Sequence, residues 1–374
     1  MDFSLTEQEK MLQQEAKEFA RNVVMPLAAE IDRTNEFPFG LAQEMAHRGY
    51  RGLPFPCAYG GAGAGYLAYA LALEQICYAS MSVGAIMAVN TVPEEALFRF
   101  GTETQKQKLL TPLVQGEKLG CIAFTEAETG SDPSAITTTA TPEGNFFVLN
   151  GEKHFVALAP GANLALVFAR DSEKGLDAFI VDTSSPGYQV KELYDTVGLR
   201  GAGTSVVSLE NVRVPRANLL GEKGRGFEVL LEAISLGRLG VAVESVGVGQ
   251  AALDLSIEYA RQRKAMGKPI ADLSTIKWLL AEMATRVEAG RWLTYRTAFQ
   301  RDRGASIRHD SSVAKLFTSQ MVVEVTRMAM QVHGSYGTVK NMTVERLYRD
   351  AKVAEIYVGI AEIQRVLIAN NLLK

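Results

Sequence analysis

Residues 145–158 read NFFVLNGEKHFVAL and place β structure inside a chain that is otherwise helical in pattern. Residues 145–149 and 153–158 are rich in β-forming side chains and partly alternate in polarity. Asn150-Gly151 lies between these two runs and has the sequence of a two-residue hairpin turn. We therefore predict a middle β domain over residues 118–225. Further strand patterns lie at 165–169, 178–181 and 206–209, and Pro215 ends them.

The sequence on both sides of this region has helical periodicity. Thr6 and Glu9 have the spacing of a capping box, which predicts a helix start. Pro93, between Thr91 and Glu94, predicts a second helix start. After the β region, long amphipathic stretches lie at 226–261, 272–301, 307–333 and 354–372.

The order helices, strands, helices differs from the alternating pattern of a Rossmann core, which is therefore disfavoured. Gly247-Val248-Gly249 lies inside the helical pattern of 226–261 rather than after a strand. We interpret these glycines as allowing close helix packing, not as a nucleotide-binding turn.

Composition and charge exclude several classes of protein. The chain has 374 residues, so two or three packed units are expected. Its net charge is −3, from 39 basic and 42 acidic side chains, which gives no general attraction for nucleic acid or an anionic membrane. The three cysteines and four histidines lack metal-ligand spacing, so no metal site is expected. Without a signal peptide pattern or an uninterrupted apolar span, a cytoplasmic enzyme is expected.

Three motifs follow one another along the chain. They are residues 123–132 (AFTEAETGSD), residues 259–267 (YARQRKAMG) and a segment from Gln331 to Gly359 that ends in IYVG. Together they resemble the signatures of the FAD-dependent acyl-CoA dehydrogenase family over nearly the whole chain. The resemblance implies an α+β fold with an N-terminal helical domain (1–117), a β-barrel-like middle domain (118–225) and a C-terminal four-helix bundle (226–374). It also implies a homotetramer, built as a dimer of dimers, with electron-transferring flavoprotein as electron acceptor.

The resemblance also assigns ligand contacts residue by residue. Residues 122–131 match the loop beside the flavin, and residues 155–157 match the strand behind its ring. Residues 263–266 match a segment that reaches the neighbouring subunit's FAD, where Arg263 suits the pyrophosphate. The implied FAD contacts are Ile122, Phe124, Thr125, Ser131, Phe155, Ala157, Arg263, Met266, Gln331, Gly334, Ser335, Ile360 and Glu362. The implied acyl-CoA contacts are Ser131, Arg238, Val241, Val358 and Gly359.

The sequence departs from the family pattern at the catalytic position. Typical members remove the substrate's α-proton with a glutamate, and that position is Val358 here. Valine cannot accept a proton, although its backbone N–H can still polarise a thioester carbonyl. A minority of members carry the glutamate one residue before Arg238, where this chain has Gly237. Phe155 and Ala157 replace the usual Trp and Thr/Ser near the flavin, and the lost hydroxyl should alter redox tuning.

Glu244 is the candidate for a relocated base. Residues 237, 241 and 244 have i, i+4 and i+7 spacing, so on a helix they share one face within about 40°. A carboxyl group among valines there should have a raised pKa, which suits a general base. The alternative interpretation is a structural ion pair with an Arg or Lys of another helix.

Two other acids, Glu94 and Glu95, lie in the segment that matches the acyl pocket wall. Acids directly after Pro93 also favour a helix N-terminus through the helix dipole, which is a structural explanation. Tyr357 is interpreted as a residue that lines the pocket.

Three functions stay open at this point. The first is an FAD-dependent oxidoreductase acting on an unusual acyl-CoA, such as a cyclic or branched one, with Glu244 or another acid of the pocket as base. The second is another reaction of a flavoprotein with this fold: a desulfinase, decarboxylase, oxidase or monooxygenase. The third is a non-catalytic subunit of a hetero-oligomer.

Overall fold

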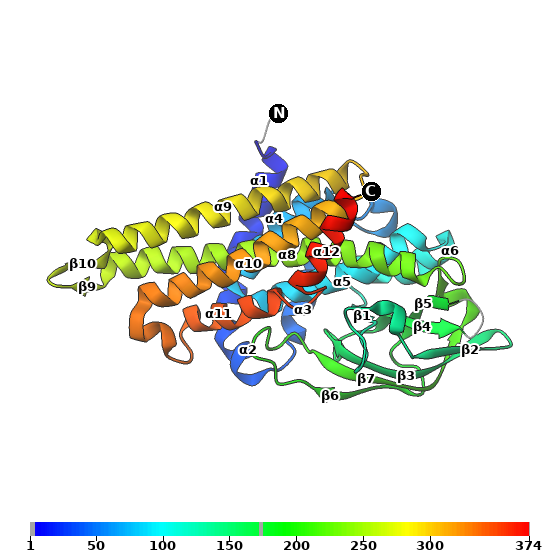
Figure 1. Ribbon diagram of the computed structural model, residues 1–374. Coiled ribbons are helices and arrows are strands. Elements are labelled where there is room, and N and C mark those ends of the chain that lie inside the picture. Colours follow the sequence, from blue (N-terminus) through cyan, green and yellow to red (C-terminus); the bar gives the residue numbers. More distant parts are fainter. Residues whose placement is uncertain (1–3, 172–174, 374) are drawn as a thin grey trace.

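The computed structural model describes residues 4–171 and 175–373. Figure 1 shows an elongated helical body with a β-sheet packed against one side, near one end. The helices are α1 (Glu7–Phe19), α2 (Ala28–Thr34), α3 (Phe39–His47), α4 (Gly65–Ala79), α5 (Met81–Phe100), α6 (Glu103–Gln105), α7 (Thr111–Val114), α8 (Gly226–Gln262), α9 (Ser274–Asp302), α10 (Arg308–His333), α11 (Thr343–Ala354) and α12 (Ala361–Leu372). The strands are β1 (Gly120–Ala123), β2 (Thr139–Glu143), β3 (Phe146–Val156), β4 (Leu164–Asp171), β5 (Gly175–Asp182), β6 (Tyr188–Leu193), β7 (Ser205–Pro215), β8 (Leu219–Leu220), β9 (Lys264–Ala265) and β10 (Lys268–Pro269).

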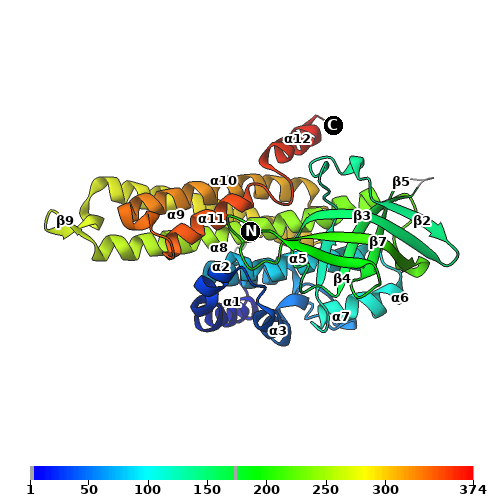
Figure 2. The same ribbon diagram turned by 90° about the horizontal axis from the view of Figure 1, so that it is seen from below.

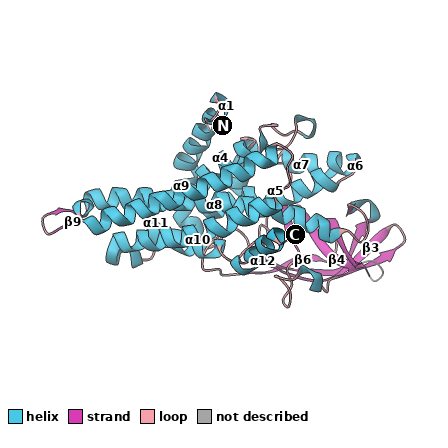
Figure 3. Ribbon diagram, turned by 45° about the horizontal axis from the view of Figure 1, so that its top comes forward, coloured by secondary structure: helices cyan, strands magenta, loops and turns pink. Residues whose placement is uncertain are grey.

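The predicted order of helices, strands and helices is confirmed. Figure 3 shows the main sheet at one end of a mostly helical molecule and the short strand β9 at the other end. The long helix α8 is central, because it packs against α4 and α5 of the N-terminal part and against α9 and α10 of the C-terminal part. Among the described residues, no helix combines the length and apolar character needed to cross a membrane.

The capping box at the start of α1 is confirmed. The Thr6 hydroxyl accepts a hydrogen bond from the Glu9 N–H (3.2 Å), and the Glu9 carboxylate accepts one from the Thr6 N–H (2.7 Å). The two groups thereby satisfy backbone donors that a helix start leaves free.

The predicted helix start near Pro93 is wrong. Helix α5 begins at Met81, where the Ser80 hydroxyl caps it, and Pro93 lies inside it. The Thr91 hydroxyl donates to the Met87 carbonyl (2.8 Å) within the same helix instead of capping a new one. Local propensity is overridden here by burial, since α5 is buried on all sides from Met81 to Leu97.

The sheet has the order β6-β7-β3-β2-β4-β5-β8, and β1 pairs in parallel with β4. The predicted hairpin at Asn150-Gly151 is wrong, because β3 continues through both residues with only a register shift against β7. A Cβ at Gly151 would lie 2.4 Å from the Thr138 hydroxyl oxygen, so this glycine permits a close strand contact. The chain turns instead at Gly144 (φ 55°), between β2 and β3. The strand patterns at 165–169, 178–181 and 206–209 lie in β4, β5 and β7, and β7 ends at Pro215 as predicted.

Glycines in α8 allow the close helix packing that the sequence indicated. A Cβ at Gly247 would lie 2.5 Å from the Glu74 carbonyl oxygen of α4. A Cβ at Gly249 would lie 3.1 Å from the Val287 side chain of α9. The interpretation of this pair as a packing feature is confirmed.

The C-terminal helix predicted over 354–372 is interrupted. Helix α11 ends at Ala354, α12 starts at Ala361, and Val358 (φ 56°) and Gly359 (φ 93°) occupy the loop between them. A β-branched residue rarely takes a positive φ, and such strain is concentrated at functional sites. Periodicity alone did not predict this break.

Glu126 fastens the loop after β1 to the sheet. Its carboxylate accepts hydrogen bonds from the Lys153 ammonium (2.7 Å) and from the N–H groups of Thr137 (2.7 Å) and Thr138 (3.0 Å). Burial raises the pKa of Glu126, but these hydrogen bonds outweigh burial and lower it to about 2. The loop is therefore held by a buried, ionised group.

We expect Glu126→Gln to destabilise the protein at pH 7 by about 1–3 kcal/mol. The folded pKa lies below the unfolded value, so the carboxylate stabilises the fold above about pH 5 and loses this effect as the pH falls towards 2. Urea unfolding at pH 7 and at pH 3 should therefore show a smaller difference between variant and wild type at pH 3. Glu143→Gln is the control, because Glu143 forms an exposed pair with Arg213. An equal difference at both pH values would contradict the assignment.

Candidate active site

Polar side chains of α10 and α12 hold the loop between α11 and α12 in place. The Lys315 ammonium donates to the carbonyl oxygens of Glu355 (3.1 Å) and Gly359 (2.7 Å), and the Gln364 amide donates to the Gly359 carbonyl (3.0 Å). In the part of the chain that the structure describes, the Val358 N–H has no hydrogen-bond partner. The loop thus keeps a free backbone donor at residue 358.

The two positions where a base was expected lie against each other. A Cβ built on Gly237 would be 3.0 Å from Val358 Cγ1 and 3.6 Å from Val92 Cγ2. Neither position holds a carboxylate. Arg238, the next residue of α8, is buried and donates to the Ser312 hydroxyl (3.3 Å).

Glu244 lies two helical turns from Gly237 and is fully buried. The Tyr357 hydroxyl donates a hydrogen bond to Glu244 Oε2, while Glu244 Oε1 has no partner among residues 4–171 and 175–373. No Arg or Lys in those ranges pairs with this carboxyl group, so the structural ion pair considered from the sequence is wrong. Burial, followed by repulsion from Asp350, raises the pKa of Glu244 well above its usual value. Val241, on the same helix face, is also buried and packs in one apolar cluster with Tyr357 and Val358.

The other two acids have different surroundings. Glu95 accepts hydrogen bonds from Tyr66, Arg99 and Arg301, so it links the N-terminal helices to α9 as a structural group. Glu94 accepts from the Asn90 amide (2.6 Å), and burial raises its pKa to about 8. Both acids lie deep inside α5, so the explanation through a helix N-terminus is wrong.

The loop after β1 presents backbone groups at the edge of the sheet. Ile122 and Phe124 are half-buried. The Phe124 carbonyl accepts from the Lys153 ammonium (3.4 Å), and the Thr125 carbonyl accepts from the His154 N–H (2.9 Å). The Thr125 N–H has no partner in the described ranges, so it is available to a ligand.

Phe155 follows His154, whose N–H donates to the Thr125 carbonyl, and it lies in an irregular part of β3. The pairing of β3 with β7 shifts between Lys153 and Val156, Phe155 has φ 55°, and its side chain is 61% exposed. Its ring stacks on Tyr194 with centroids 4.7 Å apart. A strained backbone that presents an exposed aromatic ring fits one face of a flat heterocycle such as a flavin. Ala157, two residues on, offers no hydroxyl.

Three more of the expected contacts lie near these elements. Ser131 is exposed in the loop after β1. Ile360 is half-buried at the cap of α12, and Glu362 is exposed in the first turn of that helix. Both follow Val358 directly in the chain.

The remaining expected FAD contacts lie at the other end of the molecule. Figures 1 and 2 show β9, which adjoins Arg263, at the end of the helical body opposite the sheet. Met266 is 88% exposed there, and the Arg263 guanidinium lies 6.0 Å from the centroid of the Tyr336 ring. Gln331, Gly334 and Ser335 are exposed around the end of α10, next to Tyr336.

One chain cannot bring these two groups together. Gly237 and Arg263 are separated along α8 by 26 residues, or about 39 Å of helix. If both groups bind one FAD, they must come from different copies of the chain.

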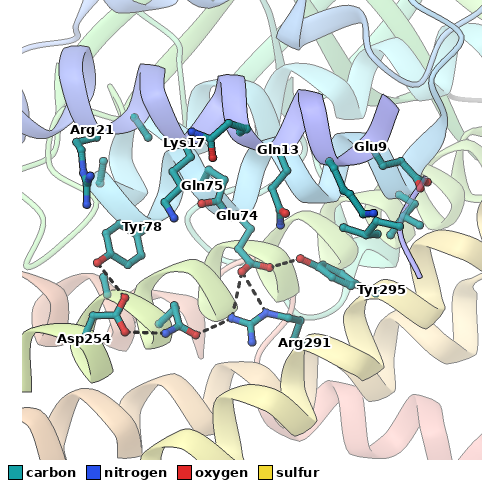
Figure 4. A pocket seen from close by; sticks show the side chains of 18 of the residues that line it. Glu9, Gln13, Lys17, Arg21, Glu74, Gln75, Tyr78, Asp254, Arg291 and Tyr295 are labelled. Carbon is teal, nitrogen blue, oxygen red and sulfur yellow. Dashed lines mark hydrogen bonds and ion pairs between the residues drawn. The ribbon is translucent and has the colours of Figure 1, made fainter. Parts of the chain in front are cut away.

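A large groove of about 1860 Å³ lies elsewhere, between α1, α4, α8 and α9. Figure 4 shows that several of its polar side chains form one connected network of hydrogen bonds and ion pairs. Tyr295 donates to Glu74 (2.7 Å), Tyr78 donates to Asp254 (3.0 Å), and Arg291 reaches Glu74. None of the expected site residues lines this groove, so we do not assign the chemistry to it.

Sequence comparison decides the family. The chain matches the models of the acyl-CoA dehydrogenase N-terminal domain over residues 6–117, the middle domain over 121–212 and the C-terminal domain over 224–373. The chain belongs to the acyl-CoA dehydrogenase family. It is therefore related to oxidoreductases, and the family implies a flavin.

Relatives in this family are named either as reductases or as dehydrogenases. The chain is 39% identical to the 3-(aryl)acrylate reductase of Clostridium sporogenes, covering 99% of both chains. It is 38% identical to the acryloyl-CoA reductase (NADH) of Anaerotignum propionicum, covering 100% of this chain and 96% of that protein. The solved structure of butyryl-CoA dehydrogenase from Megasphaera elsdenii has a TM-score of 0.98, with 33% identity and full coverage of both chains.

The resemblance to this family, read from the sequence, is confirmed, but the sequence did not predict the role of Lys315 or the hydrogen-bond partner of Tyr357. Lys315 lies in an amphipathic helical stretch, where a lysine normally indicates a solvent-facing position. Tyr357 was interpreted as pocket lining, whereas its hydroxyl bonds to Glu244. A usable signal for Lys315 was its place one turn from Ser312 and two turns from Val322, which are both buried.

Proposed function

We propose that this acyl-CoA dehydrogenase family member is an FAD-dependent oxidoreductase that interconverts an acyl-CoA thioester and its 2,3-unsaturated form. Glu244 is the proton-transferring residue, and the acyl group is unusual, such as a cyclic or branched one. The observation that carries this proposal is the fully buried carboxyl group of Glu244, whose Oε1 has no partner among the described residues. Glu244 lies on the same face of α8 as Gly237, and Gly237 lies against Val358.

Val358, Glu244 and Tyr357 each have a separate role in the proposed reaction. Among the described residues the Val358 N–H donates to no acceptor, so it is free to donate to the thioester carbonyl oxygen, which increases the acidity of the C2 proton. Glu244 exchanges that proton with C2, and the Tyr357 hydroxyl fixes the orientation of its carboxyl group. FAD, when bound, supplies the hydride acceptor in its oxidised form and the hydride donor at C3 in its reduced form.

A second candidate is the same chemistry in the reductive direction. Because the pKa of Glu244 is raised by burial, its neutral form is favoured, and a neutral acid is suited to donate a proton to C2. The names of two relatives, both reductases of acrylate derivatives, support this direction. Homotetramer formation and electron-transferring flavoprotein as a partner are further parts of the proposal that rest on the family.

The test is anaerobic mixing of the FAD-loaded protein with a panel of saturated, branched, cyclic and unsaturated acyl-CoA thioesters. Bleaching of the oxidised flavin by a saturated thioester supports the oxidative reaction. Reoxidation of the chemically reduced flavin by an unsaturated thioester supports the reductive one. Product release without net flavin reduction would instead favour a desulfinase or decarboxylase, and protein that cannot be loaded with FAD would favour a non-catalytic subunit.

A further inference from the structure

Two buried cations lie behind the loop that carries Val358. Lys315 of α10 has no exposed surface, and Arg238 of α8 is 5% exposed. Within the described ranges, the direct contacts of both cations are neutral oxygen atoms and not carboxylates. Burial of unpaired charge is strongly unfavourable, so protein interiors usually supply a counter-ion.

The surroundings of Lys315 contain few opposing charges. Its ammonium group contacts the carbonyl oxygens of Glu355 and Gly359, and the nearest acidic side chains that influence it are those of Glu355 and Glu362. The Glu355 carboxylate itself pairs with Lys352 at 2.6 Å. Burial and the charge of Arg238 lower the pKa of Lys315 to about 8, despite these two acids.

Arg238 is in a similar position. Its Nη1 donates to the Ser312 hydroxyl at 3.3 Å, and its Nε has no partner in the part of the chain that is described. Burial, together with the charge of Arg308, lowers the pKa of Arg238 to about 10. The charge of Arg238 acts on Lys315, so the two cations influence one small region. This region adjoins the contact between Gly237 and Val358, because Arg238 follows Gly237 in the chain and Lys315 binds the carbonyl of Gly359, the residue after Val358.

We propose that Lys315 and Arg238 are positioning residues that stabilise negative charge on the substrate thioester at Val358. The inference rests on the proposed function, since that function places an acyl-CoA thioester there. Lys315 holds the carbonyl groups of Glu355 and Gly359 on either side of Val358, so the Val358 N–H stays free for the thioester oxygen. The two cations then favour the enolate that forms when C2 loses its proton and the electron pair of the C–H bond spreads onto the carbonyl oxygen.

This role explains how a chain with valine at residue 358 keeps a site suited to the reaction. The enolate would supply the counter-ion that Lys315 and Arg238 do not have among the described residues. Its formation passes the C2 proton to Glu244 during turnover. With a 3-oxoacyl-CoA probe, whose C2 proton is more acidic, the proton goes to solvent and no oxidation is needed.

The experiment measures the pH at which bound acetoacetyl-CoA ionises. The FAD-loaded protein is mixed with acetoacetyl-CoA over a range of pH, and the ultraviolet absorbance of its enolate is recorded as a difference spectrum. We expect the pKa of the bound probe to lie at least about one unit below that of the free probe. Lys315→Met and Arg238→Met should each raise the bound value by about one unit, whereas Lys315→Arg should keep most of the effect.

Two further variants test whether the pKa of the bound probe depends on the charge of the cations. One alters the support of the loop, and the other alters proton transfer. Gln364→Leu removes a neutral hydrogen bond to the same Gly359 carbonyl (3.0 Å) and should leave the pKa of the probe unchanged. Glu244→Gln should slow turnover but leave that pKa unchanged, because the proton of the probe goes to solvent and not to Glu244.

A bound probe that ionises at the same pH as the free probe would overturn the inference, even if neither cation variant folds. The same holds if Gln364→Leu and Lys315→Met shift the pKa equally. Failure of acetoacetyl-CoA to bind would overturn the proposed function and this inference with it. Binding with a lowered pKa that Lys315→Met reverses supports the inference, whatever Glu244→Gln does to turnover.

Discussion

Glu244→Gln is expected to slow flavin reduction by the active acyl-CoA at least about 10²-fold, as for loss of a general base. Glutamine has nearly the same size, and its amide oxygen can still accept the hydrogen bond from Tyr357. The variant therefore loses proton transfer while keeping the packing around a fully buried side chain. Anaerobic stopped-flow absorbance of the flavin measures the rate.

Glu94→Gln is the matched control for this prediction. Glu94 is also fully buried, and its pKa is also raised, to about 8. Its carboxylate belongs to a separate cluster with Asn90 and Arg51, so its loss should leave the rate of flavin reduction nearly unchanged. Equal losses in both variants would indicate a general effect of removing a buried acid, and unchanged bleaching by Glu244→Gln would exclude Glu244 from the reaction.

Val358→Glu is expected to raise the oxidation of straight-chain acyl-CoA thioesters by at least about 10²-fold over the unmodified protein. The change places a carboxylate at the position that the resemblance to the family assigns to the base, where the backbone has φ 56°. Lys315 and Arg238 lie behind this loop and would favour the ionised form of the new carboxylate. The rate of flavin bleaching by butyryl-CoA is the measurement.

Val358→Gln controls for side-chain size, since it adds an amide of similar shape that cannot take the proton. Combining Val358→Glu with Glu244→Gln should retain the new activity, because the base no longer depends on α8. Gly237→Glu alone should give little activity, since a Cβ added at residue 237 would lie only 3.0 Å from Val358 Cγ1. If the glutamine variant matched the glutamate variant, relief of packing rather than proton transfer would be responsible.

Much of the fold could be predicted from sequence because its signals are local. The Thr6 and Glu9 capping box and the strand end at Pro215 depend on neighbouring residues, and both were found where predicted. Asn150-Gly151 and Pro93 also have strong local signals, yet both lie inside continuous elements. Tertiary packing decided these two cases, through the contact of Gly151 with Thr138 and the burial of α5.

The candidate site was predictable in part for the same reason. Helical spacing placed Gly237, Val241 and Glu244 on one face, and all three are buried in α8. The partner of Glu244 could not be read from spacing, because Tyr357 belongs to a loop more than 100 residues away in the chain. The role of Lys315 needed the loop geometry as well, since its acceptors are backbone carbonyls that no side-chain pattern reports.

The separation of Phe155 from Met266 along the elongated body has a consequence for handling the enzyme. A dissociated subunit would offer a bound FAD only one of the two groups of residues that we propose to contact it. By mass action, dilution would then release cofactor before it unfolds the chain, and added FAD would favour reassembly. Catalytic competence would thus depend on protein concentration even when every subunit remains fully folded.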